Sequence, residues 1–225
     1  MEKNIKMISA KMALPYIKDN MIVGLGGGTT IAYVVDFLEK NKVSKIKIVT
    51  PSEHTKRLCL NAGYEVLDLS MVNHVDVAFD GCDYVDEHLY ALKSGGGIHT
   101  DEKLIARMAD EYILLVDESK LEKKLSFVTP IVLECIKTAR SYVEMEVMKL
   151  GGRAEIRTSY AKEGYTISDH GNLLIDVEFD DVDDIPLLNQ KLKNICGVLE
   201  TSLFTEEVTK VLIAAEDGYK VMTRY

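Results

Sequence analysis

The sequence predicts an α/β protein in which a mostly parallel sheet with helices on its faces is joined to a smaller α+β domain. The first half of the chain alternates short apolar, strand-like runs with helix-like segments, the order that parallel βαβ units require. After about residue 129 the order becomes β-α-β-β-α-β, which is typical of a ferredoxin-like domain. The last segment returns to two β runs. We therefore expect one domain at 1–128 plus 205–225 and a second at 129–204.

The elements of the first half follow from the spacing of apolar residues. These residues share one helical face between Ile5 and Tyr16, which predicts a first helix. Parallel sheets of this kind bind ligands at the carboxyl ends of their strands, so the loops after the strands are where a site is expected. Further helices are expected at 30–40, 51–63 and 101–110, and strands at 21–25, 45–50, 64–69, 74–80 and 112–116.

The second half contains the elements of the smaller domain and of the tail. Pro186 near the start of one segment suits the first turn of a helix. Asp217-Gly218 between the last two β runs is a strong turn signal. Strands are expected at 129–136, 153–160, 165–179 and 197–204, and helices at 139–152 and 185–195.

Composition narrows the classes of protein that the chain can belong to. Its length of 225 residues suits one large domain or two small ones. A formal net charge of −9 disfavours nonspecific binding to nucleic acid, although a local pocket could still hold an anion. The four cysteines are scattered, which favours reduced thiols in the cytosol. We find neither a signal-peptide pattern nor an apolar run long enough to span a membrane, so we expect a cytoplasmic protein.

The first candidate motif is VGLGGGTT at 23–30. A glycine-rich turn between a strand and a helix exposes backbone N–H groups at the positive end of the helix dipole, and Thr29 and Thr30 add hydroxyl donors. This arrangement favours a phosphate site. The motif lacks the lysine of a P-loop and the spacing of a dinucleotide fingerprint, so nucleotide binding is not favoured. A tight turn with a threonine helix cap remains the alternative.

The second motif is FDGCD, which contains Asp80 and Asp83. The preceding apolar run should leave Asp80 at the carboxyl end of a strand, where carboxylates can bind sugar hydroxyls or exchange protons with them. The alternative is an Asp-Gly turn with solvated carboxylates. The residues alone leave these two interpretations evenly balanced.

The third motif is KSGGGIHTDEK. Lys93 precedes a second glycine-rich turn and could stabilise a developing oxyanion, while Glu102 could act as a general base. Glu102 also suits a first helical turn for purely structural reasons, and the helix dipole would keep its pKa low unless burial offsets that effect. We expect His99 to be a hydrogen-bonding residue without a catalytic role. Lys120, in VDESK, follows another strand and should face the same edge of the sheet as Asp80.

Taken together, GLGGGTT, FDGCD, KSGGG, DEK and DESK resemble the A-type ribose-5-phosphate isomerase family in order and separation. The resemblance continues through TPIVLECIKTAR, MKLGGRAEIR, SDHGNLLIDV and CGVLETSLF, so it covers nearly the whole chain. It implies a Rossmann-like domain with a smaller α+β domain, assembled as a homodimer or homotetramer. It also implies interconversion of ribose 5-phosphate and ribulose 5-phosphate in the pentose phosphate pathway, with neither metal nor organic cofactor.

The resemblance also implies roles for individual residues. Glu102 would be the proton acceptor that moves a hydrogen between C2 and C1, and Lys93 would stabilise the enediolate. Asp80 and Asp83 would hold sugar hydroxyls, and Asp80 would also assist ring opening and proton exchange between oxygens. The substrate-binding set implied in this way is Gly27, Gly28, Thr29, Thr30, Asp80, Gly81, Cys82, Asp83, Lys93, Ser94, Gly95, Gly96 and Lys120.

The motifs also depart from the usual family pattern. In the first loop, Gly27 stands where the family usually has a threonine. In the later motifs the family usually has an alanine at the position of Cys82, a glutamate at that of Tyr84 and a glycine at that of Ser94. We therefore expect altered affinity or substrate preference. A divergent paralogue acting on another sugar phosphate remains open.

Three other classes of protein are weaker alternatives. A non-catalytic sugar-phosphate sensor would keep the phosphate loop but lose the base, whereas Glu102 and Lys93 are both present. An amino-sugar phosphate deaminase or a lactonase would be expected to use a catalytic histidine. A DNA-binding regulator would need a basic recognition element, which we do not find in the sequence.

Overall fold

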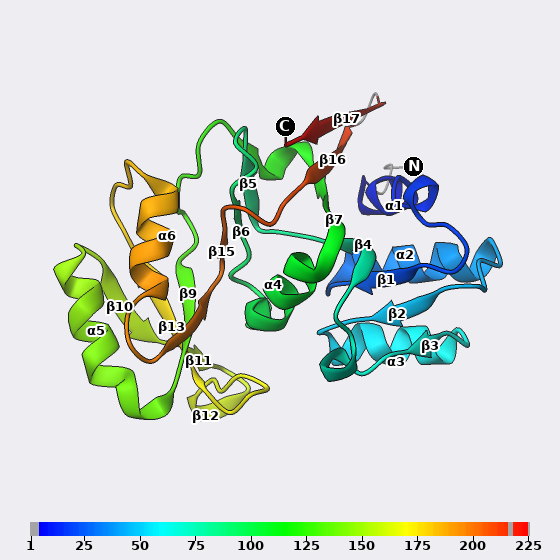
Figure 1. The fold of residues 1–225 in the computed structure, drawn as a ribbon. Coiled ribbons are helices and arrows are strands. Elements are labelled where there is room, and N and C mark those ends of the chain that lie inside the picture. Colours follow the sequence, from blue (N-terminus) through cyan, green and yellow to red (C-terminus); the bar gives the residue numbers. More distant parts are fainter. Residues whose placement is uncertain (1–4, 216–217, 225) are drawn as a thin grey trace.

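The computed structural model describes residues 5–215 and 218–224, which form two neighbouring lobes (Figure 1). Within these residues the larger lobe is built on a seven-stranded sheet of order β17-β16-β7-β4-β1-β2-β3. Every neighbouring pair is parallel except β16 and β17. The strands are β1 (Ile22–Leu25), β2 (Lys47–Val49), β3 (Glu65–Val66), β4 (Val75–Asp80), β7 (Ala109–Asp117), β16 (Lys210–Ala215) and β17 (Gly218–Thr223).

Helices cover both faces of this sheet, as the sequence predicts. Side chains alternate along β7: Ile113 and Leu115 pack beneath α1, α2 and α3, while Leu114 and Val116 belong to the core under α4. The helices are α1 (Ile5–Lys11), α2 (Thr29–Lys40), α3 (Glu53–Asn61) and α4 (His99–Met108). Short 3₁₀ turns lie at Leu14–Tyr16, Leu69–Met71, Glu118–Lys120 and Lys137–Ala139.

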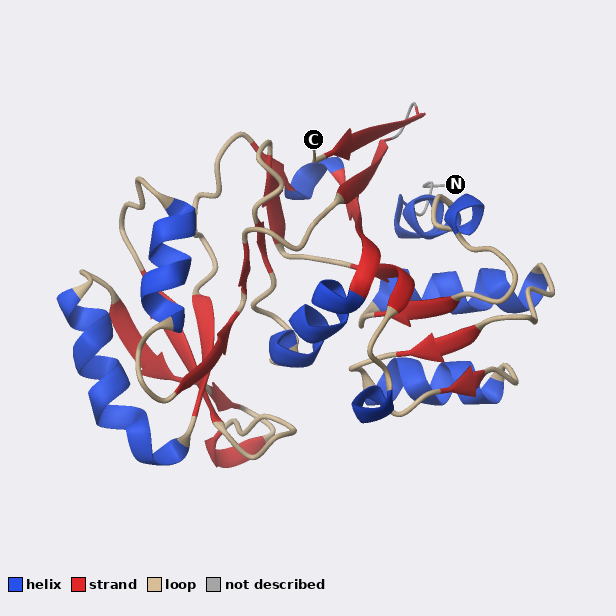
Figure 2. Cartoon of the chain, in the orientation of Figure 1, coloured by secondary structure: helices blue, strands red, loops and turns tan. Residues whose placement is uncertain are grey.

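The smaller lobe is an antiparallel sheet of order β10-β13-β9-β14 covered by two helices (Figure 2). This order is that of a ferredoxin-like domain, so the β-α-β-β-α-β pattern predicted the correct arrangement. Val143, Val147 and Leu192 lie in its core, which joins both helices to the sheet. The elements are β9 (Ile131–Cys135), α5 (Arg140–Lys149), β10 (Arg153–Ile156), β13 (Leu173–Glu178), α6 (Ile185–Lys193) and β14 (Val198–Thr201).

A third small sheet, which the sequence analysis missed, connects the lobes. It contains β5 (Tyr84–Asp86), β6 (Ala91–Leu92), β8 (Leu121–Glu122) and β15 (Leu203–Phe204). Strands of two or three residues are too short to show an alternating pattern. The predicted strand 197–204 is in fact divided at Ser202 into β14 and β15, which belong to different sheets.

Several predicted boundaries were also wrong. The strand expected at 64–69 covers only β3, because Asp68 caps a 3₁₀ turn through the Ser70 N–H. The strand expected at 165–179 begins only at Leu173, after a turn in which the Gly171 N–H donates to the Ser168 carbonyl. The segment before it forms a hairpin of β11 (Thr158–Ser159) and β12 (Lys162–Tyr165).

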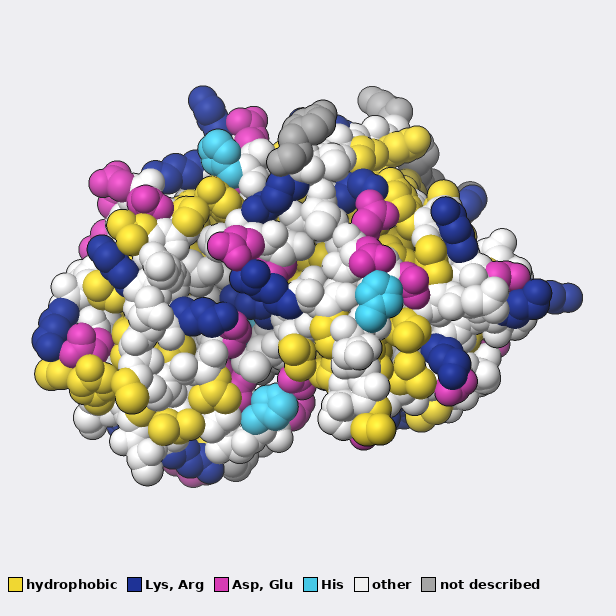
Figure 3. All heavy atoms as spheres, viewed as in Figure 1, with side chains coloured by type: hydrophobic (Ala, Val, Ile, Leu, Met, Phe, Trp, Pro, Cys, Tyr) yellow, Lys and Arg dark blue, Asp and Glu magenta, His cyan; other side chains and the backbone are white. Residues whose placement is uncertain are grey.

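The C-terminal tail returns to the large sheet. β16 and β17 pair antiparallel within the large sheet, while Asp217 of the predicted turn lies outside the described residues. Acidic and basic side chains are interspersed on the face shown in Figure 3. Within the described residues, every helix is too short or too polar to cross a membrane.

Candidate active site

The first glycine-rich loop is fixed against the end of β4. The Gly26 N–H donates to the Phe79 carbonyl at 2.9 Å, and Thr55 Oγ1 donates to the Gly26 carbonyl at 2.8 Å. A Cβ atom at Gly26 would lie about 2.0 Å from the carboxylate of Asp80, so any larger residue would displace that side chain. Gly28 precedes α2 with a φ of 89°, a conformation that L-residues rarely adopt. The glycines therefore bring the start of α2 close to Asp80.

Asp80 ends β4 as predicted, but it is buried and not solvated. Its Oδ1 accepts from the Gly81 N–H at 2.8 Å, and its Oδ2 accepts from the Tyr112 hydroxyl at 3.0 Å. Burial, followed by the charge of Asp80, holds the pKa of Tyr112 well above its ordinary value, so the phenol keeps its proton. Asp80 is thus oriented from two sides before any substrate binds.

Lys93 joins Asp80 to Glu102. Its Nζ lies 3.0 Å from Asp80 Oδ2 and 3.3 Å from Glu102 Oε1, and it donates to the Gly81 carbonyl at 2.5 Å. Burial by itself lowers the pKa of Lys93, but the charges of Asp80 and Glu102 outweigh it, so this pKa lies above its ordinary value. The ammonium therefore stays charged and is available as a fixed electrostatic donor.

Glu102 lies in the first turn of α4 with only 7% of its surface exposed. Burial, followed by the charge of Asp80, raises its pKa to about 8, although Lys93 opposes this shift. The burial that a base at a helix start would need is therefore present. A carboxylate with a pKa near neutrality is well suited to accept a proton and return it.

The second glycine-rich loop is held by Asp83. Its Oδ2 accepts from the Ser94 N–H at 2.5 Å and from the Gly95 N–H at 3.1 Å. The Ser94 hydroxyl donates to the Pro130 carbonyl, so its side chain is engaged with the backbone that leads into the smaller lobe. Lys120 Nζ donates to the Cys82 carbonyl at 2.6 Å. These bonds fix the three loops that follow β4, β6 and β7.

One cavity of about 440 Å³ brings nearly all the predicted site residues together. Ser94 is the exception, since it does not belong to the cavity lining. The predicted residues that line it are Gly27, Gly28, Thr29, Thr30, Asp80, Gly81, Cys82, Asp83, Lys93, Gly95, Gly96, Glu102 and Lys120.

The sequence analysis missed several residues at this site. Lys6 of α1, Ser52 before α3 and Asp169 of the smaller lobe also line the cavity. Tyr112, which orients Asp80, sits within an apolar strand pattern that gives no sign of a polar role. Lys6 lies outside every motif, and Asp169 lies in SDHGNLLIDV, far along the chain from the other site residues, so only the tertiary fold brings the two to the cavity.

Two residues that the sequence singled out are held in unreactive forms. Burial raises the pKa of Cys82 to about 12, so its thiol stays protonated and is a poor nucleophile. His99 is fully buried, and burial lowers its pKa to about 4, which leaves a neutral ring. Its Nε2 lies 3.4 Å from the Glu200 carbonyl, in keeping with the expected hydrogen-bonding role.

A group of side chains with metal-ligand spacing lies outside the cavity. Within the described part of the chain, one group of three side chains has metal-ligand spacing: His74, Asp76 and Asp110. They lie at the starts of β4 and β7, at the opposite end of these strands from Asp80. These groups are half-buried or exposed, and none of them lines the cavity.

Comparison with known proteins agrees with this geometry. Residues 47–218 match the family described as ribose 5-phosphate isomerase A (phosphoriboisomerase A). Ribose-5-phosphate isomerase A of Methanocaldococcus jannaschii is 38% identical over 99% of each chain, and that of Trichodesmium erythraeum is 36% identical over 98% of this chain and 94% of the relative.

Solved structures show the same likeness. Ribose 5-phosphate isomerase A from Methanocaldococcus jannaschii superposes with a TM-score of 0.92 at 37% identity, covering 99% of this chain and 100% of the other. A D-ribose-5-phosphate isomerase in complex with phospho-erythronic acid also gives 0.92, at 33% identity and 99% coverage of both chains. The chain described here belongs to the ribose 5-phosphate isomerase A family.

Proposed function

We propose that this protein interconverts D-ribose 5-phosphate and D-ribulose 5-phosphate through an enediolate, with Glu102 as the proton-transfer base. One observation carries the proposal: a buried glutamate with a pKa of about 8 lies against a charged lysine in a cavity that also contains a glycine-rich helix start. Base, oxyanion donor and anion cradle are thus within reach of one small substrate.

The phosphate group would bind at the start of α2. Backbone N–H groups of the 27–30 loop, the hydroxyls of Thr29 and Thr30, and the ammonium of Lys6 are available there. Contacts to this remote group would fix the sugar, so that its reacting carbons lie against Glu102. Gly27 offers no hydroxyl, so the phosphate end relies on the remaining donors.

The chemistry requires a proton to leave C2 of the open-chain aldose and to return at C1. Glu102 would take the C2 proton while Lys93 stabilises the negative charge that develops on the carbonyl oxygen. Asp80 would move a proton between the O1 and O2 oxygens and assist ring opening, with Asp83 holding a sugar hydroxyl. A positioned base typically contributes about 10²–10⁴-fold and one oxyanion donor about 10²–10³-fold.

The test is turnover of ribose 5-phosphate by the purified protein, followed as ribulose 5-phosphate formation and as exchange of solvent deuterium into the transferred position. We expect turnover with partial exchange, because the proton resides on Glu102 between the two steps. Tight substrate binding without turnover would favour a sugar-phosphate sensor. Faster turnover of another aldose phosphate would favour a divergent paralogue.

The proposal also covers the oligomeric state, the location in the cell and the division into domains. We infer a homodimer or homotetramer from the family resemblance, which light scattering of the purified protein would test. We also propose a cytoplasmic location and a division into domains at 1–128 plus 205–225 and 129–204. Limited proteolysis should then cut first near residues 129 and 204.

A further inference from the structure

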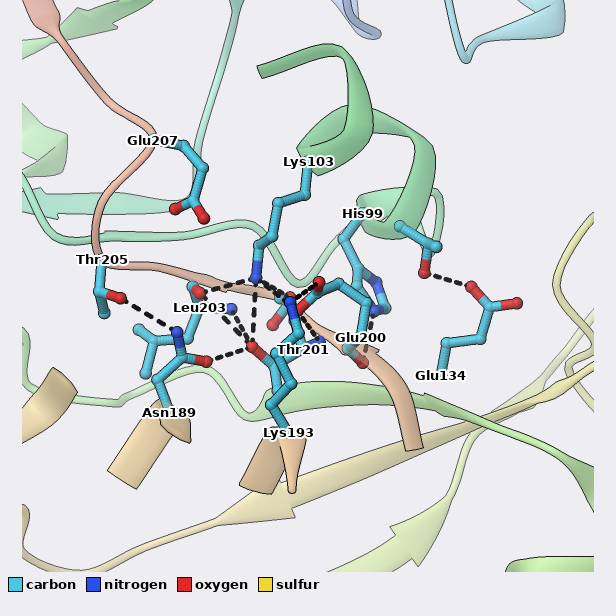
Figure 4. A network of polar contacts seen from close by, with 12 residues as sticks. His99, Lys103, Glu134, Asn189, Lys193, Glu200, Thr201, Leu203, Thr205 and Glu207 are labelled. Atoms are coloured by element: carbon cyan, nitrogen blue, oxygen red, sulfur yellow. Dashed lines mark hydrogen bonds and ion pairs between the residues drawn. The ribbon is translucent and has the colours of Figure 1, made fainter. Parts of the chain in front are cut away.

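The side chains of Glu102 and the next residue, Lys103, extend from α4 toward different parts of the molecule. Lys103 has 2% of its surface exposed, and its side chain extends to the segment that contains β14 and β15 (Figure 4). Its Nζ donates to Glu200 Oε1 at 2.9 Å and to the carbonyls of Thr201 at 2.7 Å and Leu203 at 2.9 Å. All three ammonium protons therefore have good acceptors, and Lys103 is not part of the cavity lining.

Two further contacts fasten the same helical turn to the smaller lobe. His99 Nε2 lies 3.4 Å from the Glu200 carbonyl, and Thr100 Oγ1 donates to Glu134 of β9. Glu134 is itself fixed by Ser168 Oγ at 2.6 Å. The start of α4, where Glu102 lies, is thus fastened at three residues to strands of the other lobe.

Burying a lysine ammonium costs desolvation free energy, so a buried lysine calls for a structural explanation. Burial lowers the pKa of Lys103 despite its contact with Glu200. Buried ion pairs contribute little net stability compared with apolar packing, and their best-supported use is to fix one arrangement of elements. The arrangement fixed here is that of α4, and therefore of Glu102 relative to Lys93 and Asp80.

We propose that Lys103 is a positioning residue for proton transfer: it clamps α4 to β14 and so holds Glu102 in its buried place beside Lys93. This inference rests on the proposed isomerase function, since it assigns Lys103 a role in that reaction. It requires no contact between Lys103 and substrate.

Lys193 supplies a matched control. Its Nζ lies 2.6 Å from Glu200 Oε2, so it pairs with the same carboxylate as Lys103. Lys193 comes from α6, so its ion pair with Glu200 of β14 lies within the smaller lobe. Removing either lysine takes one cation from Glu200, but only the loss of Lys103 also removes a link between β14 and the helix that carries Glu102.

The experiment compares the wild type, Lys103→Met and Lys193→Met in kcat, KM and the pH dependence of kcat/KM. In Lys103→Met we expect kcat to fall about 10- to 100-fold, because a base misplaced by about 1 Å loses up to that factor. We also expect the acid limb of kcat/KM to move to lower pH, because a displaced Glu102 becomes better solvated. In Lys193→Met both quantities should match the wild type.

The Lys103→Met and Lys193→Met results can contradict the positioning role of Lys103. Unchanged kcat and pH profile in a folded Lys103→Met, or equal losses in both lysine variants, would overturn the proposal. If Lys103→Met does not fold, Glu200→Gln takes its place, because it keeps the side-chain shape and removes the negative charge that pairs with Lys103 and Lys193. In Glu200→Gln we expect a smaller loss of kcat with a pH shift in the same direction. An unchanged kcat and an unchanged pH profile in this variant would overturn the proposal. Absence of turnover by the wild type would instead refute the isomerase function.

Discussion

Glu102 and Lys103 of α4 each belong to an ion cluster, and the two clusters differ in their ratio of charges. In one, which we call the base cluster, Asp80 and Glu102 share the single ammonium of Lys93. In the other, which we call the clamp cluster, the single carboxylate of Glu200 receives both Lys103 and Lys193. The first has an excess of carboxylates and the second an excess of cations.

The two glutamates respond in opposite directions. Burial and the charge of Asp80 raise the pKa of Glu102 to about 8. Burial also pushes the pKa of Glu200 upward, but Lys103 and Lys193 outweigh it, so this pKa is lowered. Burial alone therefore does not make a base. For these two buried glutamates, the charges beside each carboxylate set the direction in which its pKa shifts.

Glu102→Gln should produce the largest loss, because the base cluster then has no group that can accept the C2 proton. We expect kcat to fall by about 10²–10⁴-fold while the substrate still binds. Steady-state formation of ribulose 5-phosphate measures the loss, and calorimetry measures binding. Near wild-type turnover would remove Glu102 as the base and with it the functional contrast between the two clusters.

Lys93→Met should rank second. It leaves Asp80 and Glu102 facing each other without a cation and takes the donor from the developing oxyanion, for an expected kcat loss of about 10²–10³-fold. The pKa of Glu102 should rise further, so the acid limb of kcat/KM should move to higher pH, opposite to the shift expected in Lys103→Met. A limb that moves downward would contradict the assignment of Lys93.

The pH dependence of stability offers a test without substrate. The pKa of Glu102 is raised from 4.5 to about 8 in the folded protein, so its contribution to stability is full below the lower value and is lost as pH rises through the higher one. Glu102→Gln removes this dependence. Its melting temperature relative to the wild type should therefore increase by a few degrees between about pH 5 and pH 9.

Glu155→Gln, at an exposed position in β10, is the control for this measurement and should show a constant difference from the wild type. A Glu102→Gln difference that stays constant across the same pH range would mean that Glu102 titrates as an ordinary carboxylate.

Tyr112→Phe should have the smallest effect. It removes one hydroxyl from Asp80, which keeps its bonds to the Gly81 N–H and to Lys93. A hydrogen bond contributes about 1 kcal/mol net, so we expect a kcat loss of roughly fivefold and a similarly modest loss of stability. Tyr142→Phe, at an exposed site on α5, should match the wild type. Equal activity in both variants would show that Asp80 needs no support from Tyr112.

Much of the fold and the base cluster followed from local sequence patterns. Period-two and period-3.6 spacing depends on neighbours along the chain, so it located most strands and helices correctly. Asp80 ends a strand and Glu102 begins a helix within one short stretch, so the motifs alone brought them to the same edge of the sheet.

The rest was decided by contacts between distant parts of the chain. Short strands such as β6 and β15 form only because a partner segment lies beside them. Tyr112 reaches Asp80 across 32 positions, and Lys103 reaches Glu200 across 97. Burial and charge pairing set the pKa of Glu102, and both depend on which segments meet in space. The sequence by itself determined which groups stand at the ends of the strands, and the tertiary structure decided which buried glutamate has its pKa raised and which has it lowered.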